Sequence, residues 1–529
     1  MAPPPKPPSK TYDPAWVAGS LSVACGLLVA LPFWVGRFVP LLDLPQHLAM
    51  TAILRHAGEP GWGFERFFEP QWSELTPYWF HYLVLYGLSF AMPLETAGRV
   101  YVTLYALTLP LAACTFCAAL GRPRVAGLLA APLVLGANLY YGFLGYCAGA
   151  VLLLFALAAF ERQQVTPNRK TGVALALLTV ALFFAHVQML AFFVGCALLL
   201  VVSGGPSSGL RDRVHALAPL APAVLGLGLP WAFGQFVSRG SKPYFGRVGG
   251  SFGLRFEPFW KNLTGLPDAI AGSFQDGSDT WLLGLWVASF AFLAAKGRSE
   301  PAASRARARS ADDTRRRCLP LVAGALAGYF LAPMSIQGQW NINPRFAFLA
   351  VLLAVPLIRA RTPSGDRRVA AVALALSLVT GLNAVRLHRA FDHEVGPFED
   401  ALATIPREQR VLGLIYDNRG DVLYRWPYLH FPQYAVVRRG GMVSGSFARN
   451  APLPVRFRPG ATPLEPDGWR SLDFDWLTHA SSFDYVLVRG GPRSDRAIFG
   501  IGEPFVEKVF EDGSWRVYRL HDEPPPAHP

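Results

Sequence analysis

Residues 125–160 read VAGLLAAPLVLGANLYYGFLGYCAGAVLLLFALAAF, a run of 36 residues without a charged side chain. A helix rises about 1.5 Å per residue, and the hydrocarbon core of a membrane is about 30 Å thick. One helix through the whole run would therefore be nearly twice as long as a single crossing requires. The run predicts a hairpin of two membrane-spanning helices that turns near residues 138–142.

Further apolar runs lie on both sides of this hairpin. Residues 171–203 are uncharged apart from His186 and predict a second hairpin that turns near residues 185–188. Residues 318–343 predict one span followed by a polar turn. Single spans are expected at 16–36, 100–121, 216–238, 280–295, 346–358 and 369–385. We therefore expect a mainly α, polytopic helical bundle with about 11 spans, in a range of about 11 to 13.

The composition agrees with a membrane protein. Hydrophobic residues make up 52% of the chain and charged residues 16%, and the mean hydropathy is +0.28. The net charge of +13 does not indicate a nucleic-acid partner, because much of it comes from loops between the apolar runs. Such basic loops orient a membrane protein and lie against anionic lipids. We read the basic segment 305–317 as a solvated cytoplasmic loop.

Loop charges give the orientation. With the N-terminus inside and residues 78–92 forming a short helix that does not cross, the Lys- and Arg-bearing loops lie in the cytoplasm. The short turns at Tyr140, His186 and Gln339 then lie outside and carry no Lys or Arg. If residues 78–92 did cross, parity would place the basic loops at 122–124 and 162–170 outside. In either arrangement the Asp43 loop, residues 239–279 and everything after about residue 388 are extracytoplasmic.

The sequence predicts three structural parts of the chain. Residues 1–15 are expected to be a disordered cytoplasmic tail, and the first apolar run after it an uncleaved signal anchor. Residues 16–388 form the transmembrane bundle, with outside loops at 40–97 and 237–279. Residues 389–529 are expected to be a soluble, extracytoplasmic α/β domain, because they carry more charge and no run long enough to span. In this domain we predict a helix at 398–405, buried strands at 410–416 and 485–488, and a hairpin at 505–520.

Asp43 is the first candidate for chemistry. It stands where the first span meets water, in the segment PLLDLPQHL of residues 40–48. A carboxylate at this depth is partly desolvated, which favours a role with a proton or a cation. The alternative is an ordinary interfacial Asp that caps the following helix, with Pro45 in its first turn. Residues 49–56 after it are predicted to form a short amphipathic helix along the membrane surface.

These features resemble the C-type glycosyltransferase superfamily (GT-C fold), whose members transfer a sugar from a polyprenyl-phosphate carrier to an acceptor at the outer membrane face. The resemblance rests on Asp43, on the juxtamembrane helix that follows it, and on the aromatic segment TPYWFH at 76–81. The segment NPRF at 343–346 resembles the family's late arginine near the lipid phosphate. The resemblance implies an inverting hexosyl or pentosyl transfer, with Asp43 as the base and Arg345 at the phosphate. Without it, Arg345 reads equally well as a snorkelling arginine at a helix end.

Further residues are candidates for substrate binding. His186 and Gln188, at a predicted outside turn, would bind the sugar or the phosphate, or else tie their hairpin to a neighbouring helix. Tyr140 and Tyr141 would stack on a sugar face, although aromatic residues are also common at membrane interfaces for packing reasons. His47 lies four residues after Asp43, so it would orient Asp43 or contact the carrier. Arg247, in a basic outside segment, would receive an anionic headgroup or belong to a solvated loop.

No cofactor is assigned. Many members of the superfamily carry a second acidic residue nearby, sometimes with a divalent metal, but Leu44 follows Asp43 and the turn at 140–146 is free of acids. One of Glu59, Glu65, Glu69 and Glu74 would have to serve as this second acidic residue. The expected partners are a polyprenyl-phosphate sugar, membrane lipids and a glycan, lipid or protein acceptor.

The expected location is a multi-pass position in the inner or plasma membrane, at the cell envelope. The competing interpretation is a non-catalytic membrane protein that handles or transports lipid-linked glycans. A transporter should show charges within its spans or broken helices in paired halves. The sequence has no internal repeat and almost no charge in the middle of a span.

Overall fold

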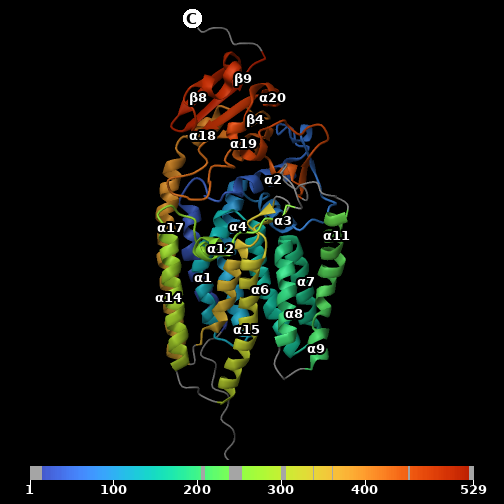
Figure 1. Cartoon of the computed structure of the whole chain (residues 1–529), viewed down its shortest axis with the longest axis vertical. Coiled ribbons are helices and arrows are strands. Elements are labelled where there is room, and N and C mark those ends of the chain that lie inside the picture. The colour runs from blue at the N-terminus through green and yellow to red at the C-terminus, as the bar shows by residue number, and fades with distance from the viewer. Residues whose placement is uncertain are drawn as a thin grey trace, which may run out of the picture.

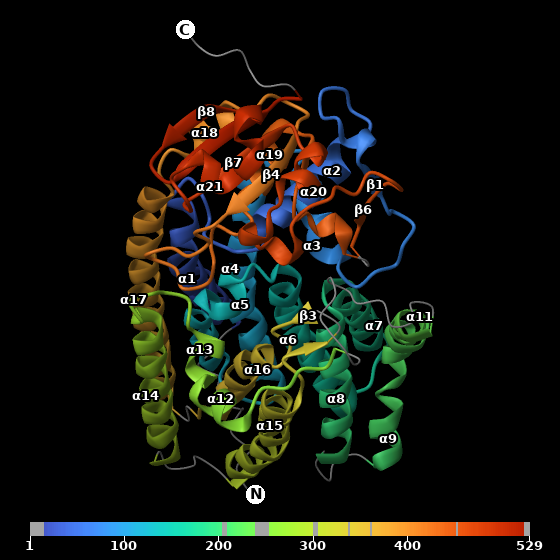
Figure 2. The same ribbon diagram turned by 45° about the horizontal axis from the view of Figure 1, so that its top comes forward.

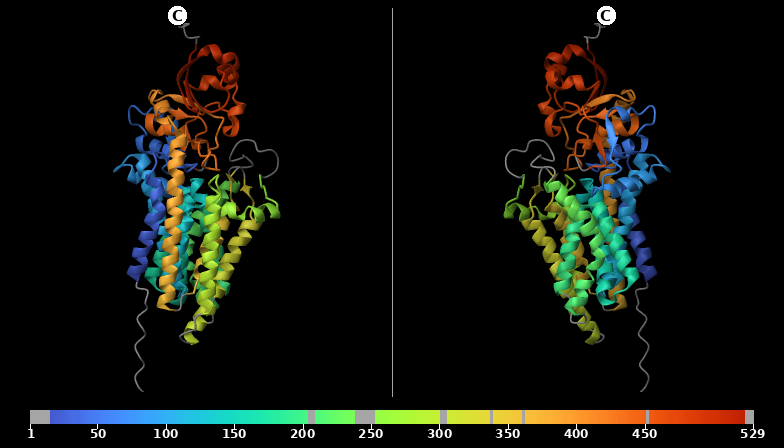
Figure 3. Two further views of the ribbon diagram at one scale, coloured as in Figure 1. Left: turned by 90° about the vertical axis from the view of Figure 1, so that its left-hand side faces the viewer. Right: turned by 90° about the vertical axis from the view of Figure 1, so that its right-hand side faces the viewer.

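The computed structural model of the chain describes residues 15–203, 209–237, 253–299, 305–336, 339–359, 362–450 and 453–522. All but the last residue of the expected tail 1–15 lies outside the described residues, and so does Arg247 with the segment 238–252. Helices run side by side in a bundle, and a β-sheet formed by the C-terminal segment lies at one end of it (Figures 1 and 3).

Helices dominate the described residues. The 3-10 helices η3 (Arg124–Ala130) and η4 (Pro132–Leu135) also belong to the bundle. In chain order the α-helices up to the end of the bundle are α1 (Ala15–Ala30), α2 (Leu44–His56), α3 (Trp79–Leu88), α4 (Leu94–Ala119), α5 (Ala137–Tyr140), α6 (Leu144–Val165), α7 (Arg169–Ala185), α8 (Val187–Ser203), α9 (Leu210–His215), α10 (Ala221–Ala223), α11 (Leu229–Val237), α12 (Phe259–Thr264), α13 (Leu266–Ile270), α14 (Ser278–Ser299), α15 (Arg305–Leu331), α16 (Pro344–Ala354) and α17 (Pro363–Val395).

Among the described residues, six helical segments are long and apolar enough to cross a membrane. They are Ala15–Trp34, Leu94–Ala119, Leu144–Val165, Arg211–Gly234, Ser278–Arg298 and Pro363–Val395. Shorter apolar helices occur at Arg124–Leu135, Val187–Ser203 and Pro344–Leu357. The protein is thus mainly helical with several candidate membrane spans, and the total of about 11 stays a prediction.

Both long apolar runs break where the sequence predicts a turn. In the first run, η3, η4 and α5 precede the bend at Tyr141–Phe143, after which α6 begins. In the second run, α7 ends at Ala185 and α8 begins at Val187, so His186 alone separates them. Helix α3 has only 10 residues, about 15 Å, and is too short to cross.

The basic segment 305–317 corrects one prediction. It was expected to be a loop, but it forms the first part of the 27-residue helix α15. Alanine and arginine have high helix propensity, so the helix extends beyond the apolar part that follows it.

The C-terminal segment builds a five-stranded mixed sheet in the order β5-β4-β7-β9-β8. Strands β4 and β7 are buried and parallel, whereas β9 runs antiparallel to both β7 and β8. The predicted helix, strands and hairpin of this segment are all present. The elements are α18 (Phe398–Ala403), β4 (Arg410–Ile415), α19 (Gln433–Arg439), β5 (Met442–Val443), β6 (Val455–Phe457), α20 (Trp476–His479), β7 (Tyr485–Arg489), α21 (Asp495–Phe499), β8 (Val506–Asp512) and β9 (Trp515–Leu520).

Helix α2 lies between the bundle and the C-terminal segment, which corrects a second prediction. An amphipathic surface helix was expected, but eleven consecutive residues from Leu44 to Leu54 are buried. Helix α19 of the C-terminal segment packs on α2, and helices α3 and α4 contact it as well, so the helix is enclosed by other parts of the chain. The first loop also adds strand β1 (Phe68–Pro70), which pairs with β6 beside α2 (Figure 2). A further two-stranded hairpin, β2 (Ser335–Ile336) with β3 (Gln339–Trp340), precedes α16.

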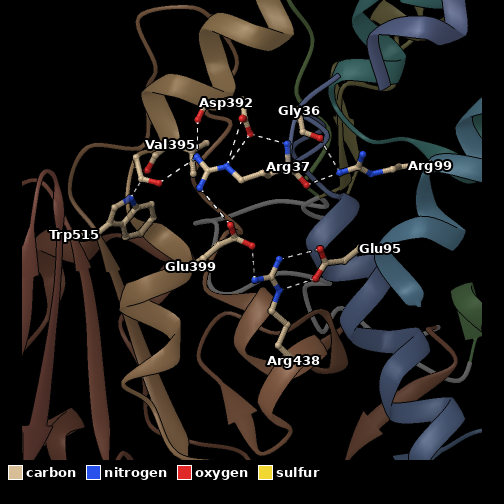
Figure 4. Close-up of polar contacts among 10 residues, drawn as sticks. Gly36, Arg37, Glu95, Arg99, Asp392, Val395, Glu399, Arg438 and Trp515 are labelled. Atoms are coloured by element: carbon tan, nitrogen blue, oxygen red, sulfur yellow. Dashed lines mark hydrogen bonds and ion pairs between the residues drawn. The ribbon is translucent and has the colours of Figure 1, made fainter. Parts of the chain in front are cut away.

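A chain of ion pairs also joins the C-terminal segment to the bundle (Figure 4). Arg37, after the first span, lies 3.3 Å from Asp392 of α17 and 3.3 Å from Glu399 of α18. Arg438 of α19 then contacts Glu399 at 2.9 Å and Glu95 of α4 at 2.7 Å. Each partly exposed pair contributes about 1 kcal/mol or less, but together they define how the C-terminal segment sits over the bundle.

Candidate functional site

The bundle and the C-terminal segment enclose a cavity of about 180 Å³. From the bundle side, its wall comes from the loop after the first span, the turn before α6, the α7–α8 break and the start of α16. Five of the residues singled out in the sequence line this cavity: Asp43, His47, Tyr141, His186 and Arg345. Asp43 and His47 belong to one segment and the other three residues to three further segments, so the fold brings four parts of the chain together. The rest of the wall is largely aromatic and includes Trp340.

Asp43 precedes α2 in the capping position, but its side chain makes no capping hydrogen bond. The carboxylate is therefore not used as a cap, and 16% of the side chain remains exposed. The backbone holds the residue in place instead. The N–H of Asp43 donates to the carbonyl of Tyr141 at 3.1 Å, and the N–H of His47 donates to the carbonyl of Asp43 at 3.1 Å.

His430 faces Asp43 from the C-terminal segment. Its Nε2 lies 3.4 Å from Oδ1 of Asp43, and only 4% of its side chain is exposed. The sequence analysis missed this residue, because it lies in the soluble-like part of the chain and carries no motif. No local sequence pattern identifies His430 as a site residue. The packing of the C-terminal segment over α2 brings it to the cavity.

His47 lines the cavity but both of its ring nitrogens are engaged. Nε2 lies 3.2 Å from the carbonyl oxygen of Gly142, which can only accept, so Nε2 carries the proton. Nδ1 then accepts from the hydroxyl of Tyr82 at 2.9 Å. Burial lowers the pKa of His47 to about 4, although the charge of Asp43 acts in the opposite direction. A neutral His47 therefore ties α2 to the turn at Gly142, and both roles expected for it, orienting Asp43 and contacting the carrier, stay predictions.

His81, in the aromatic segment 76–81, also lines the cavity and lies beside His47. Its Nε2 is 3.3 Å from Nδ1 of His47, and burial lowers its pKa. Within the described part of the chain its Nδ1 has no hydrogen-bond partner. His81 is therefore a neutral ring with a free acceptor next to the cavity.

Arg345 lies in the first turn of α16, and its guanidinium is held by polar and aromatic contacts. Nη1 is 3.1 Å from Nε2 of His186 and 3.3 Å from Oε1 of Gln188. The guanidinium carbon lies 4.2 Å from the ring centre of Phe143. Arg345 forms no ion pair with any described carboxylate, and its Nε has no described hydrogen-bond partner. It is thus a partly buried cation held in place without a counter-ion of its own.

Gln188 ties its hairpin to a neighbouring segment, which is one of the two roles expected from the sequence, and the role in substrate binding stays a prediction. Its Nε2 donates to the carbonyl of Ile342 at 3.0 Å, which ties the α7–α8 hairpin to the segment before α16. Its Oε1 also faces Arg345. Gln188 does not itself line the cavity, whereas His186 does.

Tyr140 does not line the cavity. It is only 1% exposed, and its hydroxyl lies 3.0 Å from Nε2 of His388 on α17. Of the two tyrosines expected at the site, Tyr141 lines the cavity, stacks on Phe143 with ring centres 5.0 Å apart, and bonds to Arg425. The last turn of α5 directs Tyr140 into the bundle and leaves Tyr141 at the bend.

The residues at the cavity do not fit a metal ion. None of the four first-loop glutamates lines it; Glu59 contacts Arg55 and His56, and Glu74 pairs with Arg456. Asp43 is then the single carboxylate, and the nitrogens of His47 are already bonded. In the described ranges no group of three or more His, Cys, Asp or Glu side chains could hold a metal. We derive no step through a metal.

Among solved structures, the crystal structure of ArnT from Cupriavidus metallidurans in the apo state is similar to this chain. The TM-score is 0.57 at 15% sequence identity, and the match covers 95% of this chain and 97% of the ArnT chain. The chain therefore shares the fold of ArnT over nearly its whole length, and this is the GT-C fold that the resemblance in the sequence implied. No protein-family model and no curated protein sequence matches the chain.

Proposed function

We propose that this protein is a membrane glycosyltransferase that moves a sugar from a polyprenyl-phosphate donor to an acceptor at the extracytoplasmic face. The observation that carries the proposal is the meeting of Asp43 and Arg345 at one cavity. One is a carboxylate without a capping bond, and the other is a cation without an ion-pair partner among the described residues. An inverting transfer needs a base and a group that neutralises the leaving phosphate.

Asp43 is the proposed base. Its carboxylate takes the proton from the acceptor hydroxyl as the hydroxyl oxygen attacks the anomeric carbon of the donor sugar. The bond between the anomeric carbon and the phosphate oxygen breaks on the opposite face, and its electron pair stays on the lipid phosphate. The configuration at the anomeric carbon is therefore inverted.

Arg345 is the proposed phosphate ligand. A guanidinium can donate two parallel hydrogen bonds to phosphate oxygens, and it stays charged when partly buried. Contacts with His186, Gln188 and Phe143 hold the group before the donor arrives, so little ordering is left to do in the transition state. Negative charge that develops on the leaving phosphate would complete the missing ion pair.

The aromatic wall of the cavity supports a sugar or isoprenoid ligand. Tyr141 and Trp340 form part of this wall, and 40% of Trp340 is exposed. Aromatic faces pack on the apolar faces of sugar rings and on isoprenoid chains. Basic residues in the loops at the opposite ends of the spans support an extracytoplasmic position for this end of the bundle and for the C-terminal segment.

The decisive experiment incubates the purified full-length protein with a panel of polyprenyl-phosphate sugars and acceptors, and measures release of the lipid phosphate. We expect release from at least one donor, and none by Asp43→Asn, which keeps the size of the side chain but cannot take the proton. Asp400→Asn, on the exposed first turn of α18, is the matched control and should behave like the wild type.

Two results would overturn the proposal. Normal transfer by Asp43→Asn would remove Asp43 as the base. Binding of a donor that depends on Arg345, without release from any donor of the panel, would favour the non-catalytic handling of lipid-linked glycans instead.

A further inference from the structure

His430 belongs to the C-terminal segment, yet its side chain reaches the proposed base. It lies between β4 and α19, and its ring packs edge-on against Phe447 and Trp469 at 5.4 and 5.2 Å between ring centres. These two contacts hold the plane of the imidazole. Its Nε2 therefore faces Oδ1 of Asp43 at 3.4 Å in a nearly dry environment.

Gln46, one turn into α2, determines which ring nitrogen of His430 carries the proton. The backbone N–H of Phe447 donates to Oε1 of Gln46 at 3.0 Å, which fixes the orientation of the amide. The amide nitrogen then donates to the carbonyl of Gly445 at 2.7 Å and lies 3.2 Å from Nδ1 of His430. An amide nitrogen can only donate, so Nδ1 accepts and a neutral His430 holds its proton on Nε2. Nε2 is also the ring nitrogen that lies 3.4 Å from Oδ1 of Asp43.

The backbone conformation at Gly445 permits this arrangement and favours glycine there. Its φ is +66°, and a Cβ at this position would lie 2.4 Å from the indole ring of Trp469. Its carbonyl accepts from Gln46 and also from Nε1 of Trp469 at 2.9 Å. The glycine thus lets one carbonyl fix both the amide that orients His430 and the ring that packs against it.

The other charged or titratable groups that face Asp43 do different work. His47 is neutral with both nitrogens bonded, and Tyr82 donates to His47. Arg345 acts on Asp43 through charge alone, and among the described contacts no hydrogen bond or ion pair joins the two side chains. Among the described side chains, His430 alone lies within ion-pair distance of the Asp43 carboxylate.

We propose that His430 is a positioning residue for Asp43: its Nε2–H, held by Gln46, orients the carboxylate and favours its ionised form, so that the C-terminal segment completes the active site. The inference rests on the proposed function of Asp43. A distance of 3.4 Å is long for a hydrogen bond, and catalytic hydrogen bonds commonly shorten when substrate binds. The ion pairs of Arg438 and the pairing of β1 with β6 hold the segment close enough for this contact.

The test compares the pH dependence of transfer in wild type and in His430→Ala. Without the N–H, protonation of the carboxylate becomes easier, so the acidic limb of the kcat profile should move to higher pH. A shift of one pH unit lowers kcat about tenfold on that limb, with recovery at alkaline pH and an unchanged KM for the donor. His521→Ala is the matched control, because His521 contacts Glu507 at 3.1 Å in the same segment but away from the cavity. An equal loss of kcat at every pH, or no loss, would overturn the proposal.

A second measurement does not depend on activity or on the fold of the alanine variant. Nitrogen NMR of protein labelled at histidine should show His430 protonated at Nε2, with its signals changed by Asp43→Asn. Gln46→Glu should move the proton to Nδ1 or add a second one. If wild type releases no lipid phosphate but these signals respond, the proposed function fails and the contact stands. If the NMR signals of His430 change in neither variant, the proposed contact between His430 and Asp43 is wrong.

Discussion

The backbone of Asp43 is bonded to the backbone of Tyr141, with the N–H of the first donating to the carbonyl of the second at 3.1 Å. The next pair, Leu42 to Tyr140, repeats the contact at 3.0 Å. The loop after the first span is thereby attached to the turn before α6. The proposed base is positioned by this turn as much as by its own helix.

Gly142→Ala should displace Asp43 while the Asp43 side chain itself is not substituted. An added Cβ would lie 2.6 Å from the nitrogen of Asp43, and the φ of +79° disfavours any side chain. A misplacement of about 1 Å can cost on the order of 100-fold in rate, so kcat should fall by about that factor while the KM for the donor changes little.

Gly460→Ala separates this effect from backbone strain. Gly460 has the same φ of +79°, and nothing lies within 4 Å of its Cβ position. We expect it to lower the melting temperature through backbone strain alone, by less than Gly142→Ala, and to leave kcat unchanged. Equal losses of kcat in the two variants would show that strain, not the position of Asp43, is responsible.

Arg345→Ala should weaken donor binding. Hydrogen bonds to charged groups contribute about 1.5–3 kcal/mol, which corresponds to a loss of about 10- to 100-fold in affinity for a polyprenyl phosphate. Arg345→Lys keeps the charge but loses the two-pronged geometry and should be intermediate. Direct binding of the polyprenyl phosphate without its sugar measures this, and Arg386→Ala, which removes a half-exposed partner of Asp276, is the control. Unchanged affinity in Arg345→Ala would remove its phosphate role.

The sequence was informative where structure depends on local composition. Length and lack of charge predicted that both long apolar runs break, and the turns that the loop charges assigned to one side, with His186 and Arg345 near them, do lie at the same end as Asp43. His430 could not be found this way, because its position depends on a mixed sheet and on ion pairs such as Arg438 with Glu95 that join distant segments. The sequence pattern of α2 predicts an apolar face and a polar face, but it does not predict that α19 packs on this helix.

Tyr140 and Tyr141 show the same limit at the scale of one residue. Successive side chains on a helix differ by about 100° in direction, so the exact end of α5 decides which ring reaches the cavity. Tyr141→Ala should raise the KM for the donor about fivefold, as expected for the loss of about 1 kcal/mol of aromatic packing. Tyr140→Phe should leave that KM unchanged and lower the melting temperature, because it loses only the bond to His388. The opposite pattern would place Tyr140 at the substrate.

His47 predicts a pH dependence of stability. Its pKa is about 4 in the folded protein against an ordinary 6.5, so between these values the unfolded chain binds more protons than the folded one. Stability therefore falls as the pH drops from about 6.5 to about 4, by at most about 3 kcal/mol from this residue. His47→Gln removes the titrating group, so its melting temperature should fall less than that of wild type between pH 7 and about pH 5. His521→Gln, at a partly exposed histidine, should keep the wild-type slope. A wild-type slope in His47→Gln would show that other buried histidines, not His47, carry the dependence.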